Sequence, residues 1–214
     1  RRWPALQPDA DDVGVFEEDA GFLFPERCIA AHVRMAESLG CRIEAQRRVT
    51  GWRADGAGVT VETDGGSRKC QSLVITAGAW LGQVAAELKL PLLVERQVQA
   101  WFAPKDPMMF SVGRMPVFIH FLADRAYYAI PANEQPWVKV ARHHGGVFTT
   151  ADHVDRTIAS SDEQDIRSYL RRHLPGADAP LADARVCLYT NTPDDHFLID
   201  RHPAHPNVLI AGGF

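Results

Sequence analysis

The chain has 214 residues, of which 46% are hydrophobic and 23% are charged, a composition typical of globular proteins. Its formal net charge of −4 argues against nucleic-acid binding, which usually requires a basic surface. No apolar run is long enough to span a bilayer, and no apolar segment follows the N-terminal arginines as it would in a secretory signal. The sequence therefore predicts a cytoplasmic protein that does not enter membranes.

The first predicted helix covers residues 25–39. Pro25 is favoured in the first turn of a helix, and Gly40 is the residue type that most often ends one. Four apolar residues recur at helical spacing, namely Ile29, Val33, Ala36 and Leu39. Cys28 lies on the same apolar stripe. This stripe predicts a buried helix face, with Cys28 as a core residue.

Short strands are predicted after this helix, at residues 42–45, 48–54, 58–63 and 67–70, with a hairpin turn at 64–66. Residues 73–76 form a continuous apolar run, which is typical of a strand buried on both faces. The run ends in the small residues Ala-Gly-Ala before Trp80, and a helix is expected near 80–88. Strands that end in such turns are where α/β folds bind cofactors.

From residue 92 onward the pattern indicates an antiparallel sheet with one polar face, formed by strands at 97–102, 117–122, 127–130 and 138–143. A helix is expected to follow, with Ser161 as N-cap, Gln164 completing a capping box, and an end at Pro175. Further strands are expected at 185–189, 197–199 and 208–211. The predicted fold class combines α/β and α+β features.

Three kinds of site are not supported by the sequence. The four cysteines, Cys28, Cys41, Cys70 and Cys187, form neither a Cys-x-x-Cys pair nor a zinc-binding spacing. Asp194, Asp195 and His196 have no further ligands spaced to join them, so no metal is expected. A Gly-x-Ser-x-Gly element of serine hydrolases is also missing.

Four segments, in their order and spacing, resemble the monomeric sarcosine oxidase and N-methyltryptophan oxidase family of FAD-dependent amine oxidases, within the D-amino-acid-oxidase-like superfamily. They are GFLFPERCI at 21–29, VITAGAW at 74–80, WVKVARH at 137–143 and ARVCLYTNTPDDHF at 184–197. The closing NVLIAGGF is similar to that family as well. The resemblance covers essentially the whole chain, and its most specific part is 184–197.

The glycine-rich turn with which this family begins, Gly-x-Gly-x-x-Gly, does not occur in the sequence. The resemblance therefore implies part of a longer chain: an incomplete FAD-binding domain, glutathione-reductase-like, with an inserted substrate domain built on a mixed or antiparallel sheet. The substrate domain is expected at 1–20 and 92–194, and the FAD-binding domain at 21–91 and 195–214. By themselves these residues are not expected to hold FAD strongly or to turn over.

The resemblance also assigns cofactor contacts. It implies that Cys187 carries the flavin through a thioether bond, whereas an arbitrary strand cysteine would be a small core side chain. The remaining expected FAD contacts are Ala77, Gly78, Ala79, Trp80, Gly212, Gly213 and Phe214.

Lys139 matches the lysine that this family uses to activate oxygen, although strand alternation alone would make it a solvated side chain. His143 shares the face of Lys139 and is expected to bind the amine, whereas His144 faces the other way. Tyr128 and Tyr189 match tyrosines around the flavin and substrate; without the resemblance they would be ordinary strand aromatics.

The implied reaction is the oxidation of a secondary amine, an N-methyl amino acid such as sarcosine, to an imine, with oxygen reduced to hydrogen peroxide by a monomeric enzyme. Residues 119–128 depart from the family's usual pattern, which leaves pipecolate, N-methyltryptophan or a glycated amino acid as alternative substrates. A truncated flavoprotein without catalysis is the second alternative.

Overall fold

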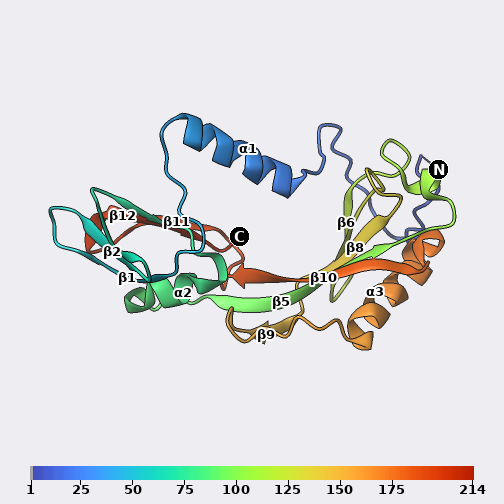
Figure 1. Cartoon of the computed structure of the whole chain (residues 1–214). Coiled ribbons are helices and arrows are strands. Elements are labelled where there is room, and N and C mark those ends of the chain that lie inside the picture. The colour runs from blue at the N-terminus through green and yellow to red at the C-terminus, as the bar shows by residue number, and fades with distance from the viewer. Residues whose placement is uncertain (1) are drawn as a thin grey trace. The chain divides into compact units, whose positions relative to one another are not determined.

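The computed structural model describes residues 2–214, which form two compact units (Figure 1). The first unit comprises Arg1–Phe22, Glu95–Phe148 and His153–Leu188, and the second comprises Leu23–Val94, Thr149–Asp152 and Tyr189–Phe214. No described helix is both long and apolar enough to cross a membrane. The mixed α/β and α+β class is confirmed, whereas the division into substrate and FAD-binding segments stays a prediction.

The first unit is built on a sheet with strand order β10-β5-β8-β7-β6, in which β9 also pairs with β5. Its strands are β5 (Leu93–Phe102), β6 (Phe118–Phe121), β7 (Ala126–Ile130), β8 (Val138–His143), β9 (Val147–Thr149) and β10 (Leu181–Asn191). Neighbouring strands among β5, β8, β7 and β6 are antiparallel, as the sequence predicts. Two 3-10 turns, η3 (Pro107–Phe110) and η4 (Pro175–Ala177), connect these elements.

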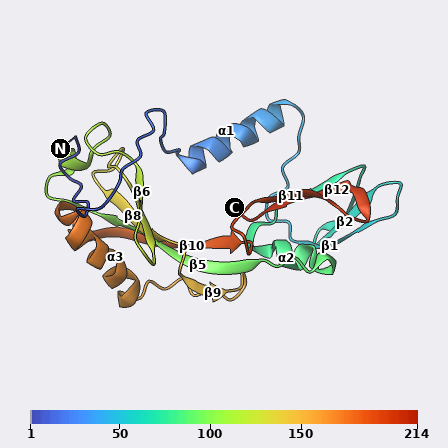
Figure 2. The same ribbon diagram turned by 180° about the vertical axis from the view of Figure 1, so that it is seen from behind.

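Helix α3 (Ser160–His173) packs against one face of this sheet, and Figure 2 shows the arrangement from behind. Alternate strand residues such as Phe102, Val138 and Val140 point toward α3 and are completely buried with its Leu170. Burial of one face by a helix follows from the alternation of strand side chains, because apolar residues at every second position share a side. The other face of the sheet is left for polar and aromatic residues.

The start of α3 differs from the prediction. The helix begins at Ser160, so Ser161 is not the N-cap and the predicted capping box with Gln164 is wrong. Instead, the Asp162 carboxylate accepts a hydrogen bond of 2.9 Å from the backbone N–H of Ala159. Asp162 therefore caps the first turn locally, and it is also paired with Arg96 of β5.

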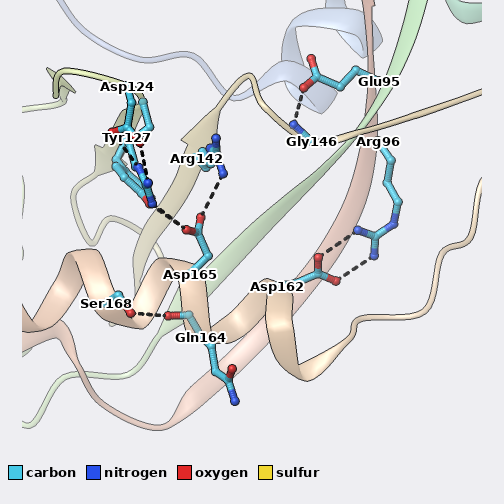
Figure 3. Close-up of polar contacts among 11 residues, drawn as sticks. Glu95, Arg96, Asp124, Tyr127, Arg142, Gly146, Asp162, Gln164, Asp165 and Ser168 are labelled. Carbon is cyan, nitrogen blue, oxygen red and sulfur yellow. Dashed lines mark hydrogen bonds and ion pairs between the residues drawn. The ribbon is translucent and has the colours of Figure 1, made fainter.

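Charged side chains tie α3 to the sheet (Figure 3). Arg96 donates two hydrogen bonds to Asp162, at 3.0 and 2.9 Å, and further ones to the carbonyls of Asp155 and Thr157. Tyr127 donates a 3.0 Å hydrogen bond to Asp165. Since bidentate arginine–carboxylate pairs are geometrically specific, these contacts determine how α3 sits on the sheet.

Replacing Arg96 with methionine is expected to lower the free energy of unfolding by about 2 kcal/mol, because the half-buried Asp162 carboxylate loses its partner. Burial by itself would raise the pKa of Asp162, but the hydrogen bonds from Arg96 and the Ala159 N–H outweigh it and lower that pKa. The carboxylate therefore stabilises the fold above the unfolded-chain pKa of about 4, and this contribution is lost as pH falls through the lowered folded-state value.

Urea denaturation at neutral and acidic pH tests this expectation. Arg172→Met is the matched control, because Arg172 forms an exposed pair with Asp9 and should cost less than about 1 kcal/mol. A loss in Arg96→Met no larger than in this control, or one that does not shrink below pH ~4, would contradict the assigned role of Arg96.

The second unit contains two three-stranded sheets, with orders β1-β2-β3 and β11-β12-β4. Its strands are β1 (Val49–Ala54), β2 (Val59–Thr63), β3 (Gly66–Cys70), β4 (Leu73–Ile75), β11 (Leu198–His202) and β12 (His205–Gly212). The predicted hairpin between β2 and β3 is confirmed. Residues 42–45 form no strand, which corrects the prediction there.

Two further predictions are wrong in the region after β3. Val74 of β4 is 60% exposed, so this strand is not buried on both faces; among residues 2–214, β4 lies at a sheet edge and pairs with β12 alone. The predicted helix near 80–88 is broken into η1 (Gly78–Trp80), α2 (Leu81–Val84) and η2 (Ala86–Leu88). A left-handed residue, Lys89, ends this series of turns.

Helix α1 (Pro25–Ser38) confirms the first predicted helix, and Gly40 takes the positive φ of 88° expected beyond a helix end. Its apolar stripe is not buried: Ile29 is 62% and Leu39 79% exposed, and Cys28 is only half-buried. The expectation that Cys28 is a core residue is therefore wrong. The spacing is helical, but none of the described elements packs closely enough to bury any residue of α1.

Candidate functional site

The sheet face of the first unit that points away from α3 carries three of the predicted site residues. Lys139 and His143 leave β8 on this face, and Ala141 lies between them. The strand register adds neighbours: Trp101 of β5 is opposite Lys139, while Tyr128 of β7 is opposite Ala141. Residues opposite each other in an antiparallel pair share a face. The sheet therefore brings Lys139, His143 and Tyr128 together.

Lys139 is held between aromatic rings. Its Nζ lies 5.3 Å from the centroid of the Trp101 ring and 5.6 Å from that of Tyr128. Both distances are within the range of cation–π attraction, which stabilises an ammonium group without neutralising its charge. The side chain is half-buried and lies at a defined place above the sheet.

His143 faces Tyr128, with ring centroids 6.5 Å apart and planes at 82°. His144 follows with a positive φ of 60°, and its Nδ1 lies 3.7 Å from the carboxylate of buried Glu95. The left-handed residue turns the chain at the end of β8, and the rings of the two histidines lie 4.1 Å apart between centroids. The expectation that His144 faces away from His143 is therefore wrong. His143 remains the histidine that shares a strand face with Lys139 and contacts Tyr128.

Cys187 lies on β10, next to β5 in the sheet, and is half-buried. The side-chain amide of Gln99 on β5 donates a hydrogen bond of 3.2 Å to its sulfur. Strand alternation places the side chain of Tyr189 on the same side of β10 as that of Cys187, although Tyr189 belongs to the second unit.

Two neighbours of the predicted site residues, Gln99 and Trp101, were not singled out from the sequence. Both occupy the same alternating positions of β5, whereas Ala100 and Phe102 between them are buried in the core. Alternation within residues 97–102 could have placed them on the polar face. Their proximity to Cys187 and Lys139 depends on strand pairing, which the sequence pattern does not specify.

In the second unit the predicted cofactor residues lie at one end of a sheet, where two parallel strands finish. Strands β4 and β12 are parallel neighbours, so their carboxyl ends point the same way. Ala77, Gly78, Ala79 and Trp80 follow the first of these strands, and Gly212, Gly213 and Phe214 end and follow the second. In α/β folds this is the edge at which ligands bind.

Glycine is required at the end of β12. A Cβ on Gly212 would collide with the Leu81 side chain of α2, and Gly213 has a positive φ of 78°. On the other side of this edge, Trp80 donates a 2.9 Å hydrogen bond to Asp152, and the ring of Phe214 lies 5.0 Å from that of Phe197. The missing side chain of Gly212 therefore lets Leu81 of α2 pack directly against the end of β12.

The predicted site residues thus form two groups, one in each unit. Lys139, His143, Tyr128 and Cys187 lie on the sheet of the first unit, and the other eight belong to the second. Within the first group, charged and aromatic side chains on β8 and β7 and a thiol on β10 lie on one sheet, which suits an aromatic cofactor with a reactive edge. Within the second group, glycine turns follow parallel strands, which suits contact with a cofactor's polar part.

Comparison with known proteins finds relatives that are amine oxidases. Monomeric sarcosine oxidase of Streptomyces avermitilis is 36% identical over 219 residues, which cover 100% of this chain and 57% of the relative. N-methyl-L-tryptophan oxidase of Citrobacter koseri is 35% identical, covering 99% of this chain and 56% of the relative. The chain therefore spans just over half the length of the curated relatives it matches.

A similar fold is found in the solved structure of fructosyl amine:oxygen oxidoreductase (Amadoriase I) from Aspergillus fumigatus. The TM-score is 0.74 at 24% identity, and the match covers 90% of this chain and 47% of that one. The profile of the FAD-dependent oxidoreductase family matches residues 1–214 in full. On this match, the chain belongs to the family of FAD-dependent oxidoreductases.

Proposed function

We propose that the protein containing this chain is an FAD-dependent amine oxidase that acts on a secondary amine, an N-methyl amino acid such as sarcosine. The observation that carries the proposal is the grouping of Lys139, His143 and Tyr128 beside Cys187 on one sheet face. The likeness to a monomeric sarcosine oxidase at 36% identity supports it.

FAD would supply the redox chemistry when bound: it would take two electrons and one proton from the amine, and these, with a second proton from solvent, would reduce oxygen to hydrogen peroxide. The residues of this chain fit such a group. Gly212 and Gly213 end a strand in a glycine turn with a positive φ at Gly213, and the turn at 77–80 follows the neighbouring parallel strand. Cys187 offers a thiol as the covalent attachment point.

Lys139 is proposed to assist the reaction of oxygen. Oxygen acquires negative charge as it accepts electrons, and a cation already fixed nearby stabilises that charge without having to reorganise. The rings of Trp101 and Tyr128 around its Nζ support this role, because cation–π contacts keep the Lys139 side chain at a defined place.

His143 is proposed to bind the amine and to influence its protonation, since only an uncharged amine has the lone pair that oxidation to an imine uses. Tyr128, whose ring faces that of His143, would line the same part of the site. Tyr189, on the same side of β10 as Cys187, would line the side near the flavin attachment. The resulting imine is hydrolysed by water to an amine and an aldehyde.

A hydrogen peroxide assay of the full-length enzyme against a panel of amines tests this proposal. We expect turnover with N-methyl amino acids, and sarcosine as the best substrate among sarcosine, N-methyltryptophan, pipecolate and a glycated amino acid. Amino acids with a primary amine, such as glycine, serve as the control, since they lack a secondary amine. Preference for another member of the panel would change the substrate but keep the chemistry; no peroxide with any amine would contradict the function.

A further inference from the structure

We infer that Gln99 is a positioning residue for Cys187, which holds the sulfur in place and stabilises its thiolate form; this rests on the proposed flavin attachment. The amide nitrogen of Gln99 donates a hydrogen bond of 3.2 Å to the sulfur. The two residues are 88 positions apart in sequence and meet because β5 and β10 are neighbours in the sheet.

The contact matters because the thiolate, and not the thiol, is the nucleophilic form of cysteine. A hydrogen bond donated to the sulfur favours this form, because such a bond is stronger to an anion than to a neutral group. In this ionisation the proton passes to solvent water and no electron is transferred.

Neighbouring contacts hold the Gln99 amide and the Cys187 sulfur in position relative to each other. Arg156 donates a hydrogen bond of 3.3 Å to the carbonyl of Val186, which restrains β10 immediately before Cys187. On β5, the neighbouring Ala100 is buried in the core, so the Gln99 backbone is anchored from the opposite face. Among the other cysteines, Cys70 is also half-buried, but its sulfur donates a hydrogen bond of 3.5 Å to the carbonyl of Val59.

The test is the rate at which iodoacetamide alkylates Cys187 in the full-length protein prepared without flavin, followed by peptide-resolved mass spectrometry over a series of pH values. Gln99→Leu should slow the reaction about tenfold at neutral pH and move the midpoint of the pH–rate profile upward. Gln99→Glu keeps the shape of the side chain but places a carboxylate beside the sulfur, so it should slow the reaction further. This variant tests the inference even if the leucine disturbs folding.

Gln97→Leu is the matched control, because Gln97 lies two residues earlier on β5 and no hydrogen bond joins it to Cys187. Cys70, measured in the same digests, is the internal control. Both should follow the wild-type profile. Gln99 variants that react along the wild-type profile, or faster at neutral pH, would overturn the inference; faster reaction would mean that the amide accepts a hydrogen bond from the thiol.

Addition of FAD to the same preparations gives a second readout. Flavin that stays with the chain after acid precipitation should form more slowly in Gln99→Glu than in the wild type. If wild-type protein forms none while Gln99→Leu still shifts the alkylation profile, the flavin attachment is refuted but the role of Gln99 at the sulfur stands. If attachment occurs equally fast in all variants, Gln99 does not position the sulfur for it.

Discussion

Full-length protein with Cys187 replaced by serine is expected to lose all flavin that stays with the chain after acid precipitation. A serine hydroxyl keeps its proton at neutral pH and cannot replace the thiolate as a nucleophile. The wild-type protein should retain its flavin through the same treatment, because a thioether bond survives denaturation. Absorbance of the washed precipitate near the flavin bands measures the difference.

Cys70→Ser is the matched control for this experiment, because Cys70 is a half-buried strand cysteine of the second unit with no proposed role. It should keep acid-stable flavin at the wild-type level. Flavin that comes off the wild-type chain freely would refute covalent attachment, and acid-stable flavin in Cys187→Ser would assign the attachment to another residue.

Replacing Lys139 with methionine is expected to slow reoxidation of the reduced flavin by oxygen about 100-fold, the usual effect of removing one group that stabilises developing negative charge. Methionine has a similar length and can keep the contacts with the rings of Trp101 and Tyr128, but it has no charge. Reduction of the flavin by the amine should change little, because Lys139 is proposed to act on oxygen. Stopped-flow absorbance resolves the two half-reactions.

Lys69→Met supplies the comparison, since Lys69 is an exposed lysine on β3 of the second unit. In the Lys69→Met variant, neither the reduction of the flavin by the amine nor its reoxidation by oxygen should change in rate. Lys139→Arg retains a cation and should recover part of the oxygen reactivity, with a loss that reflects the different shape of the guanidinium group. If methionine slows both half-reactions of the flavin equally, Lys139 does not act specifically on oxygen.

Local patterns predicted most of the regular structure. The alternation of apolar residues placed most strands of the first unit, although β9 was not predicted, and the proline and glycine at its ends placed α1. The wrong predictions concern burial and boundaries. The apolar stripe of α1 is exposed, Val74 lies on an open edge strand, and α3 starts at Ser160 with Asp162 as its capping residue. Burial depends on which other elements pack against a segment, and the spacing of apolar residues within that segment carries no information about them.

The sequence by itself determined which side chains can do chemistry and which of them share a strand face: Lys139 with His143, and Cys187 with Tyr189. These relations follow from the two-residue period of a strand, which is local. Only the tertiary structure decided the partners across strands. Trp101 meets Lys139, and Gln99 meets Cys187, because β5 pairs with β8 and lies beside β10. Strand pairing joins residues far apart in the chain and is selected by the packing of the whole sheet, so no local pattern specifies it.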